Sequence, residues 1–239
     1  HDALPICSKY GFIANGLFQS EEEIANSATV KGYKALPGYI KYVDRNGDGI
    51  ITAAQDQGYV GKSATPKHTG SLNLFGNWKG FDFDLLFSWV LGNVVALTGQ
   101  YTASGSEGTQ DNTSFTKPFY HGGNSPTFLV ENSWTPDHTN AEFPRLEITG
   151  PSNNNGYSST FWYRNGNYMR LKTAQIGYNF PKKWLNPAGI EGLRLYVEGY
   201  NLLTFSGLTK YNIDPESPAV NNGYYPQQRT YTLGVKLTF

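Results

Sequence analysis

The chain has 239 residues, and its 19 Lys and Arg balance 19 Asp and Glu, so the formal net charge is zero. A balanced charge gives no long-range attraction to nucleic acid or to acidic membranes. The single Cys7 excludes an internal disulfide framework and any Cys-x-x-Cys metal or redox site. No run of 18 apolar residues is present, so no transmembrane helix is expected. A membrane β-barrel stays compatible with the sequence, because its strands alternate apolar and polar residues and need no such run.

The beginning of the chain, HDALPI, resembles an artefact of sequencing or assembly more than the start of a protein. We therefore set residues 1–7 aside from the fold and treat 8–239 as the part to be explained.

The stretch YVDRNGDGIITAAQD, residues 42–56, resembles the calcium loop of an EF-hand. Its candidate metal ligands are oxygen-bearing groups: the side chains of Asp44, Asn46, Asp48 and Asp56 and the backbone carbonyl of Ile50. Gln55 replaces the Glu that closes an EF-hand, and the preceding LPGYIKY is typical of a turn and a strand, so an EF-hand sensor is disfavoured. Two interpretations stay open: a weak calcium site closed by Asp56, or an Asx-rich turn in which Gly47 and Gly49 supply positive φ angles.

Five segments alternate apolar and polar residues at a period of two, which predicts strands with one apolar and one polar face. In chain order they are SLNLFGNW (71–78), GFDFDLLFSWVLG (80–92), YMRLKTAQIGYNF (168–180), GLRLYVEGYNLLTF (192–205) and TYTLGVKLTF (230–239). In the third segment the apolar set passes from Met169 and Leu171 to Ala174 and Ile176. That change of phase predicts a bulge or a change in what surrounds the strand.

Short and long connections alternate between these segments. WKG and PKKWLNPAGIEG are short, whereas the links over about 93–159 and 205–228 are long. Short turns at one end and long loops at the other are typical of an outer-membrane β-barrel. A soluble β-sandwich produces the same alternation within strands, so the pattern alone leaves both open. Aromatic residues near strand ends, such as Trp78, Tyr178 and Trp184, favour a barrel with aromatic girdles.

Several motifs, in their order and spacing, resemble the C-terminal part of SusC-type (RagA-like) TonB-dependent outer-membrane transporters. The motifs are GFIANGLFQSEEEI, LPGYIKYVDRNGDGIIT, YVGKSATPKHTGSLNLFGNWKGFDFDLLFSWVLGN, SWTPDHTNAEFPRL, GNYMRLKTAQIGYNFPKKWL, LRLYVEGYNLLTF and YPQQRTYTLGVKLTF. The resemblance implies an all-β fold: a transmembrane antiparallel β-barrel of about 22 strands. This chain would supply about the last five strands with long extracellular loops, and the plug domain and earlier strands would lie outside it.

The resemblance also implies a function. Such transporters lie in the outer membrane of Gram-negative bacteria and import oligosaccharides, or in some cases peptides. Their partners are a SusD-like surface lipoprotein and TonB, which acts through the plug region. We therefore expect a chain in contact with outer-membrane lipid and with an oligosaccharide or peptide substrate. We expect no nucleic-acid partner, and no required cofactor beyond a possible calcium ion.

Aromatic residues in or beside the long connections are candidates for contact with substrate or with the lipoprotein. They are Trp134, Tyr163, Tyr211, Tyr224 and Tyr225. Aromatic rings stack on the apolar faces of sugars and are favoured at protein interfaces. Packing within the loops is a third interpretation, and the sequence leaves all three open.

Catalytic chemistry is not indicated. Asp82 and Asp84 are alternate residues on one strand face, but no partner constellation accompanies them, so a solvated face in the barrel lumen is expected. The chain is therefore not expected to be an enzyme. The alternative function, from another class, is a surface or secreted all-β carbohydrate-binding module with a calcium-stabilised loop.

Overall fold

The computed structural model describes residues 10–60, 63–97, 101, 119, 124–147, 155–217 and 227–239. The chain divides into two compact units, which are described separately. The described residues of the first unit lie within 10–64 and 94–164, and those of the second within 65–93, 165–217 and 227–239.

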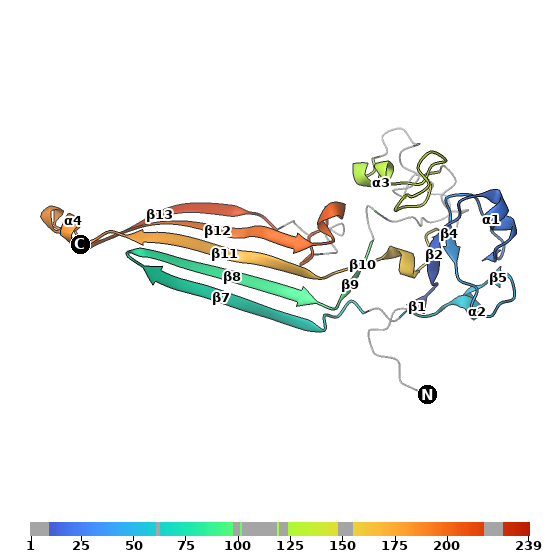
Figure 1. The fold of residues 1–239 in the computed structure, drawn as a ribbon, viewed down its shortest axis with the longest axis horizontal. Helices are drawn as coiled ribbons and strands as arrows, with labels where there is room; N and C mark the ends of the chain where they lie inside the picture. Colours follow the sequence, from blue (N-terminus) through green and yellow to red (C-terminus); the bar gives the residue numbers. More distant parts are fainter. Residues whose placement is uncertain are drawn as a thin grey trace, which may run out of the picture. The chain divides into compact units, whose positions relative to one another are not determined.

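A five-stranded antiparallel sheet forms the second unit (Figure 1). Its strands are β7 (His68–Trp78), β8 (Phe81–Leu91), β11 (Tyr168–Asn179), β12 (Gly192–Ser206) and β13 (Thr230–Thr238). The order across the sheet is β13-β12-β11-β8-β7, so neighbours along the chain are neighbours in space. All five strands expected from the alternating pattern are present.

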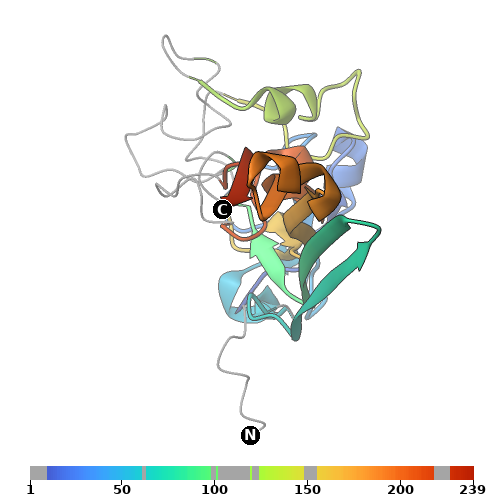
Figure 2. The same cartoon turned by 90° about the vertical axis from the view of Figure 1, so that its left-hand side faces the viewer.

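The short connections lie at one end of this sheet. Lys79 and Gly80 join β7 to β8 with φ angles of 50° and 92°, the left-handed pair that a two-residue hairpin turn requires. Helix α4 (Lys182–Leu185) and the 3-10 turn η6 (Asn186–Ala188) join β11 to β12. Figure 2 looks from that end, with α4 and the C-terminus toward the viewer. The connections from β8 to β11 and from β12 to β13 are the long ones, as expected.

The predicted bulge in the third segment is confirmed. The register of β11 shifts between Leu171 and Thr173 against both of its neighbours, β8 and β12. Before the shift Leu171 lies opposite Phe87, and after it Ala174 lies opposite Leu85. Relative to β8, Lys172 is the extra residue, and it keeps the apolar residues on one face along the whole strand. On the other side, β12 places two residues, Asn201 and Leu202, opposite Lys172.

One face of the sheet is apolar and exposed across all five strands. Exposed fractions include 77% for Leu233, 55% for Val197 and 58% for Ile176. The register places these three residues in one row across β13, β12 and β11, and the row continues to Phe83 on β8. Most polar and charged residues of the strands lie on the opposite face.

The first unit is built from short elements that the periodicity did not predict. Its strands are β1 (Tyr10–Gly11), β2 (Ala14–Leu17), β3 (Thr29–Val30), β4 (Ile40–Tyr42), β5 (Ile50–Ile51), β6 (Gly58–Tyr59), β9 (Val94–Ala96) and β10 (Tyr163–Asn165). They pair as β1 with β6, β2 with β4, β3 with β5 and β9 with β10. Its helices are α1 (Glu21–Ala25), α2 (Ala53–Asp56), α3 (Thr127–Glu131) and the 3-10 turn η5 (Thr160–Trp162).

Distant segments of the chain share the core of the first unit. Phe12 exchanges backbone hydrogen bonds with Ser158 and Thr160, and the buried Ile40 donates its N–H to the Asn155 side chain at 2.8 Å. The fully buried side chains here include Phe143. Segments that the sequence indicated only as long connections are therefore packed together. None of the helices in the described part of the chain is long and apolar enough to span a membrane.

Candidate functional site

The acidic loop of residues 42–56 is held by its own side chains. The Asp44 carboxylate accepts backbone N–H bonds from Gly47 at 2.7 Å and Gly49 at 2.8 Å. Both glycines have positive φ angles, 76° and 82°, which a residue without a Cβ adopts freely. Hydrogen bonds to the charged form stabilise it, so the Gly49 amide, with the neighbouring amides, lowers the pKa of Asp44 from its ordinary value. These bonds are those of an Asx-rich turn.

Asp48 and Asp56 accept further backbone bonds, at different depths. The exposed Asp48 accepts the N–H of Ile50 at 2.9 Å. Asp56 is fully buried, and its two oxygens accept the N–H groups of Arg45 at 2.9 Å and Thr52 at 2.7 Å. Asp56 therefore ties the beginning of the loop to the residue that precedes α2.

Carboxylates among the expected calcium ligands accept hydrogen bonds from backbone N–H groups. In the part of the chain that the structure describes, no three His, Cys, Asp or Glu side chains gather closely enough to hold a metal ion. Each oxygen of Asp56 accepts one backbone N–H, as each oxygen of Asp44 does. Strand β4 lies before the loop in place of a helix, which agrees with the exclusion of an EF-hand. Calcium binding through Asp44, Asn46, Asp48, Asp56 and the Ile50 carbonyl stays a prediction.

A balanced cluster of four charges lies on the polar face of the sheet in the second unit. Arg170 of β11 is 2% exposed, and its guanidinium donates to the Thr204 hydroxyl at 2.9 Å, to Asp214 at 2.7 Å and to Glu216 at 3.2 Å. The Lys172 ammonium donates to Glu216 at 2.6 Å. The cluster therefore fixes the segment after β12 to β11.

A second network crosses β8, β11 and β12 nearer the short turns. The Arg194 guanidinium pairs with the Asp82 carboxylate, and its Nε–Oδ2 distance is 3.0 Å. Asn179 donates to the same carboxylate at 2.7 Å, and Arg194 also donates to Gln175 at 2.8 Å. The sequence did not indicate these partners of Asp82, which lie on two other strands and form an ion pair and a hydrogen bond with it. Asp84 is exposed, as expected for a solvated face.

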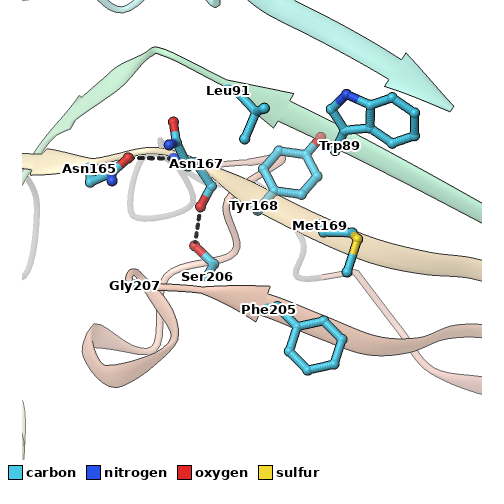
Figure 3. Close-up of a pocket in the computed structure, with 9 residues that line it drawn as sticks. All are labelled: Trp89, Leu91, Asn165, Asn167, Tyr168, Met169, Phe205, Ser206 and Gly207. Carbon is cyan, nitrogen blue, oxygen red and sulfur yellow. Dashed lines mark hydrogen bonds between the residues drawn. The ribbon is translucent and has the colours of Figure 1, made fainter.

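The apolar face of the sheet carries a hollow of about 540 Å³. It lies at the end of the sheet where the long connections begin. Trp89, Met169 and Phe205, from three adjacent strands, line it together with Leu91 (Figure 3). Polar groups border it, where Ser206 donates to the Asn167 carbonyl at 3.2 Å. Aromatic rings also gather at the opposite end, where the ring centroids of Phe81 and Tyr178 lie 4.7 Å apart. The apolar face is thus bounded by aromatic residues at both ends.

The candidate aromatic contacts are dispersed. Trp134 is 6% exposed, and its indole N–H donates to Gln19 at 3.0 Å. Tyr211, in the 3-10 turn η7 (Thr209–Tyr211), is 1% exposed, whereas Tyr163 is half-buried at the start of β10. Tyr224 and Tyr225 lie outside the described residues. Trp134 and Tyr211 are buried, and contact with substrate or lipoprotein stays a prediction for the whole set.

Known proteins resemble this chain over nearly all of its length, although no family model matches it. It is 31% identical over 248 residues to TonB-dependent receptor P3 of Formosa agariphila, covering 98% of this chain and 22% of that receptor. It is 28% identical over 254 residues to TonB-dependent receptor P26 of the same organism, covering 100% of this chain and 23% of that receptor. The chain belongs to the TonB-dependent receptors.

Solved structures show the same fold. The chain superposes on the structure of the RagAB peptide transporter with a TM-score of 0.62 and 24% identity, covering 97% of this chain and 23% of that one. For the open-open state of the RagAB peptide importer the TM-score is 0.60 with 22% identity, and the superposition covers 99% of this chain and 24% of that one. The sequence-based prediction of a TonB-dependent transporter segment, with an all-β antiparallel barrel fold and long loops, is confirmed. This receptor chain spans about a fifth of the length of the curated relatives it matches.

Sequence reasoning missed the charge cluster around Arg170 in this TonB-dependent receptor. Its only signal was an Arg and a Lys at alternate positions, 170 and 172, which indicated a polar strand face. Their partners at 214 and 216 lie more than 40 residues further along the chain. Pairing across that separation follows from the packing of the segment after β12, which no local pattern encodes.

Proposed function

We propose that this chain forms part of the barrel wall of a TonB-dependent transporter that imports oligosaccharides or peptides across a Gram-negative outer membrane. The observation that carries the proposal is the exposed apolar face of the five-stranded sheet, on which Leu233 is 77% exposed. A contiguous apolar surface of this kind is rare on soluble monomers. In a membrane barrel an apolar face of this kind faces the lipid hydrocarbon, and this contact stabilises the folded protein.

The polar face supports passage of a hydrated molecule. Several charged side chains on it form ion pairs, as Arg194 with Asp82 and Arg170 with Asp214. Ion pairs of this kind tolerate a water-filled lumen, whereas an isolated Arg or Lys facing lipid would cost roughly 2–4 kcal/mol at the midplane. The transporter therefore places its two faces in two solvents.

The proposed partners are a SusD-like surface lipoprotein and TonB. The related RagAB is described as a peptide transporter, which supports a two-component importer but leaves the substrate of this protein open between oligosaccharide and peptide. The curated relatives are named as receptors and not as enzymes, which supports a transport role without catalysis.

The alternative, a soluble carbohydrate-binding module, would have to bury the same apolar face. Deletion of the gene from the bacterium that carries it separates the two functions. Labelled neutral oligosaccharides, labelled acidic oligosaccharides and labelled peptides are supplied, and uptake into the cell is measured. We expect uptake of one class to fall and the protein to be recovered with outer membranes. Unchanged uptake, with the protein in the soluble fraction, would contradict the transporter.

Calcium binding by the acidic loop is a second proposal, and it rests on the side-chain oxygen atoms of Asp44, Asn46 and Asp48, which are ligands that calcium prefers. The test compares resistance of the loop to proteolysis with calcium and with a chelator. We expect calcium to protect the natural loop and to give no protection after Asp48→Ala. If the natural loop is equally resistant with calcium and with the chelator, the loop does not bind calcium, and equal protection of both proteins by calcium would exclude Asp48 as a ligand.

A further inference from the structure

A small polar cavity lies on the polar face of the sheet in the second unit. Its volume is about 200 Å³, and it is walled by β11, β12, the segment after β12 and the residues just before β13. The residues that matter for its chemistry are Arg170, Asn201, Thr204, Thr209, Asp214 and Arg229. Ligand pockets for drug-sized molecules run to about 300–1,000 Å³. This cavity is therefore suited to one chemical group of a larger molecule.

The floor of the cavity is preformed. Each of the three Arg170 nitrogens donates a hydrogen bond, and Asp214 also accepts the backbone N–H of Glu216 at 2.9 Å. Beneath the segment after β12, Leu208 and Ile213 are 0% and 4% exposed, so the wall is anchored by apolar packing as well. A satisfied buried network is rigid, so the cavity does not have to be formed on binding.

Arg229 gives this cavity an unbalanced positive charge. Arg170 and Lys172 are neutralised by Asp214 and Glu216, two charges of each sign. Arg229 is exposed, and among the described residues no ion pair or hydrogen bond engages its guanidinium. Asn201, the residue of β12 with a φ of 55°, donates to the carbonyl of Gln228 at 3.1 Å and so holds the backbone beside Arg229 in place.

The lining selects one kind of group. None of the described residues around the cavity is aromatic, so none of them offers the stacking that holds the apolar face of a sugar. A guanidinium matches the two oxygens of a carboxylate in geometry and charge. The hydroxyl of Thr209 and the amide of Asn201 add neutral polar groups beside it.

We propose that this cavity is a subsite for a carboxylate of the imported molecule, with Arg229 as its charged partner. The inference rests on the proposed transport function and narrows its substrate. Two sources can present such a group: a peptide, through its C-terminus or an acidic side chain, and an oligosaccharide that contains uronic acid.

The test uses the protein produced from its natural gene, purified from outer membranes with whatever partner accompanies it. It is incubated with tryptic peptides of casein, with oligogalacturonates and with neutral maltooligosaccharides. The two acidic pools are each supplied as an equal mixture of free acids and methyl esters. The measured quantity is the ratio of acid to ester retained, by mass spectrometry.

The variants are Arg229→Gln, which removes the charge, and Arg229→Lys, which keeps it. The matched control is Lys236→Gln, which removes one positive charge from the exposed polar face of β13, away from the cavity. Equal amounts of assembled protein in outer membranes show that all variants fold.

We expect the natural protein to retain the free acids of one pool about tenfold over their esters, as one charge-assisted hydrogen bond allows. The pool that shows this preference identifies the source of the carboxylate. Arg229→Gln should reduce the ratio to about one, while Arg229→Lys and Lys236→Gln should keep most of it.

Other results overturn the inference. If the acids of neither pool are preferred, or if Arg229→Gln keeps the preference, the subsite does not exist, although transport stands. Retention of the neutral oligosaccharides alone also excludes the subsite and leaves transport standing. If no pool is retained and deletion of the gene leaves uptake unchanged, the proposed function fails together with the subsite.

Discussion

At the residue scale, the acidic loop depends on one buried carboxylate more than on its exposed ones. Asp56 satisfies two backbone donors in a place without water, whereas Asp48 bonds locally in solvent. We expect Asp56→Ala to destabilise the first unit by about 3 kcal/mol, since a buried carboxylate loses two charge-assisted bonds to partly buried donors. Asp48→Ala should cost less than about 0.5 kcal/mol. Hydrogen exchange at the Arg45 and Thr52 amides measures the effect of both substitutions. Similar effects of the two substitutions would contradict the larger structural role given to Asp56.

The pH dependence of the same loop follows from Asp44. Its pKa is lowered from the ordinary 3.8, chiefly by the Gly49 amide, so the carboxylate stabilises the loop above that pH. The contribution is lost as pH falls below 3.8 through the lowered value. We expect the Gly47 and Gly49 amides to exchange faster with falling pH over that range, beyond the normal pH effect on exchange. Asp44→Asn should remove the pH-dependent part, and a persisting transition would assign it to another group.

At the element scale, the bulge in β11 holds the apolar face together. Deleting Lys172 would move Ala174, Ile176 and Tyr178 to the polar face and bring Thr173 and Gln175 to the apolar one. We expect this deletion to abolish assembly of the protein in the outer membrane. Lys172→Ala removes the ion pair with Glu216 but keeps the register, and at 32% exposure that pair contributes about 1 kcal/mol or less.

The measurement for both changes is the amount of assembled protein in outer-membrane fractions. The substitution should leave that amount near normal, whereas the deletion should reduce it to a trace. If the deletion assembled as well as the substitution, another residue of β11 would be able to form the bulge.

The elements differ in how far the sequence predicts them. The five long strands follow from a period of two sustained over eight or more residues, and the change of phase at Leu171 located the bulge. The first unit was not predicted, because strands of two to four residues such as β3 and β4 are too short to show a period. Their packing depends on segments more than 100 residues apart, as between Ile40 and Asn155.

The candidate sites show the same limit. The acidic loop was located by its own residues, and its Asx-rich turn was one of the two interpretations offered, because its bonds join residues two to five apart. The Arg170 cluster and the cavity beside Arg229 combine β11, β12 and the start of β13. Those residues are brought together only by the order of strands in the sheet.

At the scale of the whole molecule, the proposal that the sheet separates lipid from a water-filled lumen can be tested at adjacent residues of one strand. Leu233 is 77% exposed on the apolar face of β13, opposite Val197, whereas its neighbour Thr232 lies on the polar face opposite Glu198. If the apolar face meets lipid, Leu233→Arg places a charge in the hydrocarbon at a cost of about 2–4 kcal/mol. In Thr232→Arg the new guanidinium lies opposite the carboxylate of Glu198 on β12, so the change in protein stability should be close to zero or slightly favourable.

Stability of the protein folded into phospholipid vesicles, measured by urea titration of tryptophan emission, distinguishes these two outcomes. A protein whose sheet faced water on both sides would accept an exposed arginine at either position, since a surface substitution changes stability by about 0.5 kcal/mol at most. Equal midpoints for the two variants would therefore contradict the lipid-facing assignment, and with it the barrel wall as the place of this chain. A lower midpoint for Leu233→Arg alone would show that the Leu233 face of β13 meets the bilayer. Through the register of the sheet, it would also fix which faces of the other four strands meet lipid.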